Sequence, residues 1–392
     1  MKVLHIGKFF PPHRGGIETH IQDLCHGLAR LAAVEVIVAN DARHRTVEQS
    51  EAISVRRLAR IAEVAAVPIC PQMVRAIRAT PADIVHLHLP NPYTSAAFLL
   101  SDHPAPLIVS WHSDIVRQRL LSRLLQPIER AMVRRAAAFI ASSPNYLETS
   151  PTLAANRERS HVIPYGIDDR EFQRPDAARV AALRLRYGPR IVLAVGRLVY
   201  YKGFDHLIHA MRSVAGHLLI VGEGPLRAKL ERDAIDAGVR ARVTFMGNLS
   251  RAELIDCYHA ADVFALPSVA RSEAFGIVQL EAMACGKPVI NTQLSCGVPY
   301  VSIDGETGIT VAPGAAEPLA AAVNRLLEDS ALRMLYGAAA RRRVRKYFNL
   351  DLMVDRTYDL YRQILYGDRG DSSADVPPHS LDIRPQRSSV TA

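Results

Sequence analysis

Two glutamates beside an apolar, helix-forming run carry the most informative chemistry in the sequence. The stretch at 271–288 reads RSEAFGIVQLEAMACGKP and holds Glu273 and Glu281, eight residues apart. A helix that begins near Gly276 would point its free backbone N–H groups and the positive end of its dipole toward Glu273. Such a helix end binds anions, usually phosphate. Glu281 would lie roughly 12 Å further along the axis. A ligand that reaches both carboxylates must be long and carry hydroxyl groups, as a nucleotide sugar does. The alternative is a capped amphipathic helix with two solvated glutamates.

Two cations follow a predicted strand in the stretch at 191–205, which reads IVLAVGRLVYYKGFD. The apolar run at 191–195 predicts a buried parallel strand, and Gly196 lets the backbone turn closely. Arg197 and Lys202 then lie in the loop at the carboxyl end of that strand, the edge at which open α/β sheets bind their ligands. Arginine offers a fork to two phosphate oxygens and lysine a point charge. Alternatively, both are solvated loop cations.

The first half of the chain offers a matching set of residues. The loop PPHRGG at 11–16 ends in Gly15 and Gly16, which permit close approach of the backbone to a phosphate. His112 comes directly after the strand expected at 106–110, again at a carboxyl edge. The position favours a functional role for His112 over an ordinary structural one. Three other histidines are interpreted as structural hydrogen-bonding residues: His5, His86 and His88.

Taken together, these stretches resemble glycosyltransferase family 4, the retaining nucleotide-sugar transferases of GT-B fold. The resemblance covers nearly the whole chain, and the order and spacing of the motifs make it specific. The motifs are Gly15-Gly16, SWHSD around His112, PYGID at 164–168, GRLVYYKG at 196–203, GEGP at 222–225, the pair Glu273 and Glu281, and DGETG at 304–308.

The resemblance implies a donor site in the second half of the chain. Arg197 and Lys202 would neutralise the donor diphosphate and stabilise the departing charge. Glu273 would contact hydroxyls of the transferred sugar, and Glu281 the ribose diol. The loop at 245–249, which contains Gly247, would border the base. Backbone amides that support the phosphates or the sugar are expected at three positions: Phe275, Gly276 and Ile277.

The resemblance also implies roles for the first half and for the reaction. The loop with Gly15 and Gly16 would face the diphosphate, and His112 would lie near the reacting sugar. Configuration would be retained by a front-face reaction, in which the departing phosphate accepts the acceptor's proton. No metal and no cofactor are expected, because Arg197 and Lys202 take the place of a cation.

The alternation of apolar strand-like and helical runs predicts an α/β protein with parallel sheets and crossover helices. In the first half, strands are expected near 2–6, 34–39, 53–57, 83–88, 106–110, 138–142 and 160–163. In the second half they are expected near 190–195, 217–221, 242–245, 262–266, 288–290 and 309–311, and helices fill roughly 317–366.

At 392 residues the chain is long enough for two domains. We expect two Rossmann-like domains that face each other across a cleft: an acceptor-side domain at 1–164 and a donor domain at 165–349. The resemblance implies that the last helix, at 350–366, crosses back to the first domain. The polar, Pro/Ser-rich segment at 367–392 is expected to be disordered.

Composition predicts a globular, cytoplasmic protein. Hydrophobic residues make up 49% and charged residues 22%, and no apolar stretch approaches the ~20 residues of a membrane span. The chain begins with a strand-like MKVLHIG rather than a signal peptide. Its five cysteines are scattered, so reduced thiols are expected rather than a metal site or a disulfide framework.

A basic amphipathic segment at 115–137 predicts contact with a membrane. It holds six arginines against the single acid Glu129, with leucines at helical spacing. Such a helix can lie on an anionic membrane surface, and the formal charge of +9 favours this over an ordinary solvated face. The acceptor would then be a polyprenyl-diphosphate-linked glycan at the inner face of the plasma membrane. The product would be an exopolysaccharide or O-antigen repeat unit.

The donor sugar is predicted from resemblance alone. The stretches WHSD at 111–114, SPNY at 143–146 and SCGVPYV at 295–301 are similar to mannosyltransferases of polysaccharide assembly. They point to GDP-mannose, while UDP-glucose, UDP-N-acetylglucosamine and UDP-galactose stay open. A dinucleotide oxidoreductase is disfavoured because no G-x-G-x-x-G follows a strand. A basic, non-catalytic nucleic-acid-binding protein is the alternative from another class. With only 6% aromatic residues it would offer few stacking platforms, so no nucleic-acid partner is expected.

Overall fold

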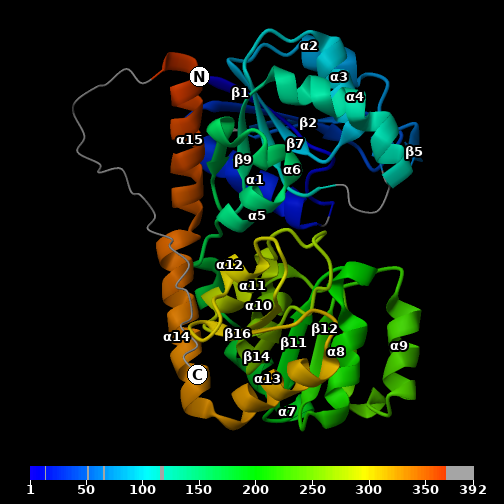
Figure 1. Ribbon diagram of the computed structural model, residues 1–392, viewed down its shortest axis with the longest axis vertical. Helices are drawn as coiled ribbons and strands as arrows, with labels where there is room; N and C mark the ends of the chain where they lie inside the picture. Colours follow the sequence, from blue (N-terminus) through cyan, green and yellow to red (C-terminus); the bar gives the residue numbers. More distant parts are fainter. Residues whose placement is uncertain (14, 51–52, 65–66, 115–118, 368–392) are drawn as a thin grey trace, which may run out of the picture.

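The computed structural model describes residues 1–13, 15–50, 53–64, 67–114 and 119–367, and only the backbone of 119–124. The described chain forms two α/β units that lie one above the other, with the last two helices along one side of both (Figure 1). Of the tail predicted at 367–392, residues 368–392 lie outside the described residues. The fold class is therefore confirmed: two parallel-sheet units and a C-terminal helix that returns to the first.

The first unit is built on an eight-stranded sheet of order β10-β9-β8-β7-β1-β2-β4-β3. Its parallel strands are β1 (Lys2–Ile6), β2 (Ala33–Ala39), β4 (Ile53–Leu58), β7 (Ile84–Leu89), β8 (Leu107–Trp111), β9 (Ala136–Ala141) and β10 (Ser160–Val162). The antiparallel edge strand β3 (Thr46–Gln49) and a separate hairpin of β5 (Ala62–Val64) and β6 (Val67–Ile69) were not predicted.

Six helices belong to the first unit: α1 (Gly16–Leu28), α2 (Met73–Arg78), α3 (Pro92–Ser101), α4 (Arg119–Arg135), α5 (Pro144–Thr149) and α6 (Pro151–Ala154). Because the crossover connections make the strands parallel, β1, β7 and β8 all end at the same edge of the sheet. In Figure 1 helices α1 and α5 lie at that edge, facing the second unit.

The second unit is built on a six-stranded, all-parallel sheet of order β13-β12-β11-β14-β15-β16. Its strands are β11 (Ile191–Val195), β12 (His217–Val221), β13 (Val243–Gly247), β14 (Val263–Ala265), β15 (Val289–Thr292) and β16 (Gly308–Val311). Its helices are α7 (Ala177–Tyr187), α8 (Phe204–Ala210), α9 (Arg227–Asp236), α10 (Arg251–Ala260), α11 (Ile277–Ala284), α12 (Val298–Val301), α13 (Ala316–Glu328) and α14 (Ser330–Tyr347). The helical stretch predicted at 317–366 is thus three helices, of which α15 (Leu350–Tyr366) is the last.

The two covalent crossings between the units lie side by side. The amide of Ile167 donates to the carbonyl of Phe348 at 2.9 Å, and the amide of Leu350 donates to the carbonyl of Ile167 at 3.0 Å. Helix α15 then packs against α1, where Gly27 leaves the space that the Val354 side chain fills. The helix therefore returns to the first unit, as the sequence predicted.

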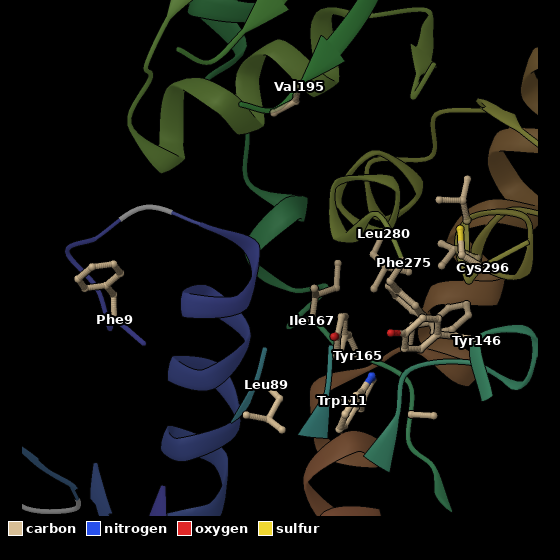
Figure 2. Close-up of a cluster of buried hydrophobic side chains, with 14 of the residues drawn as sticks. Phe9, Leu89, Trp111, Tyr146, Tyr165, Ile167, Val195, Phe275, Leu280 and Cys296 are labelled. Carbon is tan, nitrogen blue, oxygen red and sulfur yellow. The ribbon is translucent and has the colours of Figure 1, made fainter. Parts of the chain in front are cut away.

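One apolar core runs from the first unit into the second. Figure 2 shows Trp111, Tyr146 and Tyr165 of the first unit and the crossing segment close to Phe275 and Cys296 of the second. The rings of Tyr165 and Phe275 have centroids 4.8 Å apart. All five cysteines are buried and free. Among the described helices, none is long and apolar enough to cross a membrane.

Candidate active site

A buried ion pair joins the two motifs that the sequence placed at a donor site. Lys202, in the turn after β11, lies with its Nζ 2.5 Å from Oε2 of Glu273, and both residues are less than a tenth exposed. Burial pushes the pKa of Lys202 down, but the Glu273 carboxylate outweighs it and raises that pKa above its ordinary value. The hydroxyl of Ser268 donates to the same carboxylate oxygen at 3.1 Å. Lys202 is therefore a fixed positive charge.

Two glycines make this arrangement possible. A Cβ on Gly196 would lie about 3.1 Å from Cε and 3.2 Å from Nζ of Lys202, so glycine leaves room for the ammonium group. Gly276 has a φ of 77° in the left-handed region, which favours glycine, and a Cβ there would collide with Leu266 and Gln279. Gly276 is the N-cap of α11, so the free backbone amides of the first turn of this helix lie beside the segment that holds Glu273.

The second predicted carboxylate has partners of its own. Glu281 on α11 accepts a hydrogen bond from Nη1 of Arg251 at 2.5 Å and another from the Tyr258 hydroxyl at 2.6 Å. Arg251 also donates to both oxygens of Glu171, a residue of the linker between the units, at 3.0 and 2.9 Å. Burial lowers the pKa of Arg251, but Glu281 and Glu171 raise it to a net value above the ordinary one. The side chain of Glu281 is thus held in place by two hydrogen-bond donors.

The first helix turns of α1 and α11 meet where the two units face each other. A Cβ on Gly16 would lie 3.7 Å from Cδ1 of Ile277, across the boundary between the units. Gly15 is the N-cap of α1, and a Cβ there would strike the Glu18 carboxylate. Gly16 therefore lies against the first turn of α11, so the positive ends of the α1 and α11 dipoles come close to each other.

The remaining predicted donor residues line the same edge. Arg197 is exposed in the loop after β11. Burial is the main cause of the lowered pKa of Lys8, a residue that follows β1, and the charge of Arg197 lowers this pKa further. Gly247 ends β13 with a φ of 68°, and its carbonyl accepts from the amide of Gly222 at 2.8 Å. Phe275 is buried against Tyr165.

His112 is enclosed, with both ring nitrogens occupied. Its Nδ1 lies 2.5 Å from the hydroxyl of Tyr165, and its Nε2 lies 2.9 Å from Nδ1 of His88. Burial lowers the pKa of His112 well below its usual range, so the ring is neutral. The structure therefore joins His112 to the linker and to the histidines of β1 and β7, which the sequence interpreted as structural.

Histidines gather under α1 in numbers that the sequence did not predict. One nitrogen from each of His20, His88 and His112 lies within 4.8 Å of the others, and the same holds for His5, His86 and His88. Among the described residues, Nδ1 of His20 has no hydrogen-bond partner, whereas the other four histidines bond to one another or to hydroxyls. The cluster is therefore held together as a hydrogen-bonded group.

Residues that the sequence interpretation missed join the two units beside the site. Arg271 lies 3.4 Å from the carboxylate of Asp114 and donates to the carbonyl of Thr149 at 2.9 Å. Arg251 and Tyr165 were missed as well. The residue types gave a signal, since Arg271 directly precedes the Glu273 motif and Tyr165 lies within PYGID. Two hollows on the surface of the described chain lie on the first unit, away from these residues. The lining of one includes Leu31, and the lining of the other includes Arg45.

Comparison with known proteins gives the same result for both halves. A family model described as glycosyl transferase 4-like domain matches residues 15–166, and one described as glycosyl transferases group 1 matches residues 178–343. The O-antigen chain mannosyltransferase C of Escherichia coli is 31% identical over 369 residues, which is 93% of this chain and 99% of that protein. The D-rhamnosyltransferase WbpZ of Pseudomonas aeruginosa is 33% identical over 89% of this chain and 92% of its own length.

A solved structure supports the fold. The sucrose-phosphate synthase of Thermosynechococcus elongatus superposes with a TM-score of 0.78 at 26% identity, covering 93% of this chain and 98% of that chain. The matches extend over both units and include the segments that hold Lys202, Glu273 and Glu281. The chain therefore belongs to the group 1 family of glycosyltransferases, and it is a glycosyltransferase of GT-B fold.

Proposed function

We propose that this glycosyltransferase moves a mannosyl residue from GDP-mannose to a polyprenyl-diphosphate-linked glycan, with retention of configuration, in O-antigen or exopolysaccharide synthesis. The buried pair of Lys202 and Glu273 at the start of α11 carries the proposal. It supplies one fixed positive charge for a leaving diphosphate and one carboxylate for sugar hydroxyls at the same point. The first-turn amides of α11 and the glycines of α1 add donors for the phosphate oxygens.

The proposed reaction needs no protein nucleophile. The acceptor oxygen bonds to the anomeric carbon while the bond from that carbon to the donor phosphate breaks. The proton of the acceptor hydroxyl passes to a phosphate oxygen on the same face. Lys202 and Arg197 stabilise the charge that develops on the diphosphate, and Glu273 keeps its role as a hydroxyl acceptor. No metal is required in this scheme, so a chelator such as EDTA should leave transfer intact.

The mannosyl donor is supported by the sequence resemblance and by the name of the Escherichia coli relative. The Pseudomonas aeruginosa relative is named for D-rhamnose, which lacks the hydroxyl at C6 that mannose carries. A UDP-sugar such as UDP-glucose, UDP-N-acetylglucosamine or UDP-galactose is the alternative donor, with fold and chemistry unchanged. The nucleic-acid-binding alternative is not pursued, because the chain belongs to a family of enzymes.

Thermal stabilisation by GDP, UDP, ADP, dTDP and NAD, followed by transfer assays with the matching sugar nucleotides, tests the donor. We expect GDP alone to raise the melting temperature and GDP-mannose to be consumed with a polyprenyl-linked acceptor. Stabilisation by UDP alone would replace mannose with a UDP-sugar. Transfer from GDP-D-rhamnose but not from GDP-mannose would show that the enzyme selects a sugar without a hydroxyl at C6.

The acceptor and the location are proposed from helix α4 and the charge of the chain. The segment at 115–137 is rich in arginine, and the structure places its described part in the long helix α4 of the first unit. Arg130 and Arg134, four residues apart, are exposed there. We place the enzyme on the cytoplasmic face of the plasma membrane, bound through this helix to anionic lipid.

A further inference from the structure

A continuous hydrogen-bonded chain runs from the site into the first unit. It starts at the linker, passes through four histidines and a tyrosine of α15, and ends on β8. Its links are Tyr165 Oη to His112 Nδ1 at 2.5 Å, His112 Nε2 to His88 Nδ1 at 2.9 Å, His88 Nε2 to His5 Nδ1 at 3.1 Å, His5 Nε2 to Tyr361 Oη at 3.5 Å, Tyr361 Oη to His86 Nδ1 at 2.5 Å, and His86 Nε2 to Ser110 Oγ at 2.8 Å.

Strand register brings these side chains together. His86 and His88 lie two residues apart on β7 and therefore point to the same face of the sheet. His5 on β1 pairs in register with His86, and Ser110 on β8 pairs with His88. Helices α1 and α15 cover that face with apolar side chains, so the polar chain is sealed from water.

Every imidazole in the chain is neutral. Burial lowers the pKa of His5 to about 3 and holds the pKa of His86, His88 and His112 well below the usual range. A neutral ring has one N–H donor and one nitrogen acceptor. Each of the four rings therefore donates one hydrogen bond and accepts one.

The head-to-tail order of the nitrogens allows only two patterns. In each link between histidines an Nε2 meets an Nδ1, so the protonation of one ring dictates that of the next. His112, His88 and His5 therefore carry the proton either all on Nε2 or all on Nδ1. The Tyr361 hydroxyl extends this pattern to His86 when it accepts from one ring and donates to the other. A mixed pattern would set two donors or two acceptors face to face in a buried place, at a cost of about 1–3 kcal/mol. The chain thus behaves as a single unit.

We propose that His88 is a positioning residue, which acts through this chain to hold His112 as its Nε2–H tautomer with Nδ1 as a hydrogen-bond acceptor. Nε2–H is the intrinsically preferred tautomer of a neutral histidine side chain, and it lets Tyr165 donate to His112. The Tyr165 hydroxyl covers Nδ1 of His112, and the Tyr165 ring contacts Phe275 of the predicted donor loop, so only Tyr165 separates this nitrogen from that loop. When Tyr165 gives way, this nitrogen accepts a hydrogen bond from a donor-sugar hydroxyl. The inference rests on the proposed function.

The tautomers can be read without any substrate. Ring nitrogen spectra of selectively ¹⁵N-histidine-labelled protein, assigned with single His→Gln variants, should show His5, His86, His88 and His112 all neutral and protonated on Nε2 between pH 6 and 8. A His112 ring protonated on Nδ1, or an average of the two tautomers, would overturn the proposal.

Two substitutions at His88 separate the two directions of the chain. The amide of His88→Asn reaches the position of Nδ1 and can keep the bond to His112, whereas the amide of His88→Gln reaches the position of Nε2 and can keep only the bond to His5. We expect His88→Gln to lower kcat roughly tenfold to a hundredfold, the scale found when a hydrogen-bonding partner of a functional histidine is removed. The donor KM should change little, and His88→Asn should recover most of kcat. His103→Gln, at a buried histidine outside the chain, is the control.

Equal loss of kcat in both His88 variants at equal thermal stability would overturn the positioning role. If His88→Gln does not fold, the tautomer of His112 in the wild-type protein decides. Tyr361→Phe then tests the chain: it separates His86 from His5, so the spectrum should change at His86, whereas His5 keeps its tautomer through its bond to His88. An unchanged spectrum in Tyr361→Phe would count against the chain. If the wild-type protein transfers no sugar from any sugar nucleotide, the proposed function is refuted. The tautomer measurement needs no substrate, so its result would still hold.

Discussion

Each carboxylate of the proposed donor site is held by its own cation, and this limits the interactions that the two carboxylates can make. Glu273 pairs with Lys202 inside the protein, whereas Glu281 pairs with Arg251 at a more accessible place. A carboxylate oxygen has two lone-pair directions, so both residues can still accept hydroxyl hydrogen bonds while they keep their cations. Neither carboxylate is left as an isolated buried charge, which would be costly.

The Lys202 ammonium is expected to be essential for turnover. Lys202→Ala should lower kcat by about 10²–10³, the range for loss of one preorganised stabilising group. Breaking a buried pair also costs about 3–5 kcal/mol of folding free energy, so unfolding must be measured alongside steady-state kinetics. The double variant Lys202→Met/Glu273→Gln should recover stability without activity. Lys229→Ala, in the surface pair with Asp233, is the control. Near-normal kcat in Lys202→Ala would remove the lysine from the mechanism.

Glu281 is expected to govern nucleotide affinity. Glu281→Ala should weaken GDP binding by about 1.5–3 kcal/mol, the value of a hydrogen bond to a charged group, as measured by calorimetry. Arg251→Ala should weaken it less, because the Tyr258 hydroxyl still orients the carboxylate. Glu231→Ala on α9 serves as the matched surface control. The ribose role fails if GDP affinity is the same in Glu281→Ala and in wild type.

Sequence patterns predicted the residues of the donor site but not their partners. Lys202 was recognisable because it lies in the loop after a predicted strand, and Glu273 because it lies just before a predicted helix. Arg251 and Tyr165 follow no such rule. Arg251 begins α10, and it reaches Glu171 and Glu281 only through tertiary packing. Which cation meets which carboxylate is decided by side-chain geometry that local pattern does not encode.

At the scale of elements, the predicted strands all occur, and the central ones, such as β1, β7, β8, β11 and β14, are short apolar runs that are almost wholly buried. The edge strand β3 and the hairpin of β5 and β6 were missed. Their residues are largely exposed, so they lack the apolar signal that marks a buried strand. The histidines of β7 were interpreted as structural. The register of β7 with β1 and β8 brings them together with His5 and Ser110 in the hydrogen-bonded chain that also contains His112.

The sheet face under α1 and α15 is expected to make the protein sensitive to acid. Burial lowers the pKa of His5 and His20 to about 3, and lowers the pKa of His86, His88 and His112 well below 6.5. The unfolded chain therefore binds more protons than the folded one below pH 6.5, and stability falls as pH drops from there toward 3. The slope is up to about 1.4 kcal/mol per pH unit for each histidine.

Denaturant unfolding at pH 7.5, 6.5 and 5.5, measured in buffers of equal ionic strength, checks this. We expect a moderate loss between the first two values, because the five histidines are half protonated in the unfolded chain at pH 6.5, and a steeper loss at the third. Asp23 opposes the trend weakly, because burial raises its pKa to about 6 and its protonation favours the folded state. His5→Gln should reduce the slope by about one proton, whereas stability independent of pH across this range would show that the histidines are not buried as neutral rings.

At the scale of the whole molecule, the two units are linked more tightly than their two covalent crossings require. The crossings bond to each other at Ile167 and Phe348, and the apolar core continues through Tyr165 and Phe275. Arg271 ties the second unit to Asp114 of the first. Arg271 and Tyr165 are thus contacts between the units that lie beside the residues predicted to bind the donor.

The charge of the first unit is expected to set where the enzyme works. The segment at 115–137 holds six arginines, of which three are not fully described. Arg117 lies outside the described residues, and only the backbone is described for Arg119 and Arg123. In the described part of α4, Arg130 is exposed, whereas Arg135 donates to the carbonyls of His103 and Ala105 and is used for packing. The helix thus divides its arginines between structure and surface.

Substitution of three of these arginines tests the membrane contact. Arg117→Ser/Arg119→Ser/Arg123→Ser should weaken sedimentation with anionic vesicles by on the order of a hundredfold, because each basic residue near the surface contributes about 1 kcal/mol. Transfer to a short, water-soluble acceptor should be unchanged, which separates membrane binding from catalysis. Arg342→Ser/Lys346→Ser, on the exposed face of α14, is the matched control for loss of positive charge. The triple variant could sediment like wild type while added salt releases both proteins from the vesicles, and the binding would then be electrostatic but come from another surface. If the triple variant sediments like wild type and salt releases neither protein, α4 is an ordinary solvated helix.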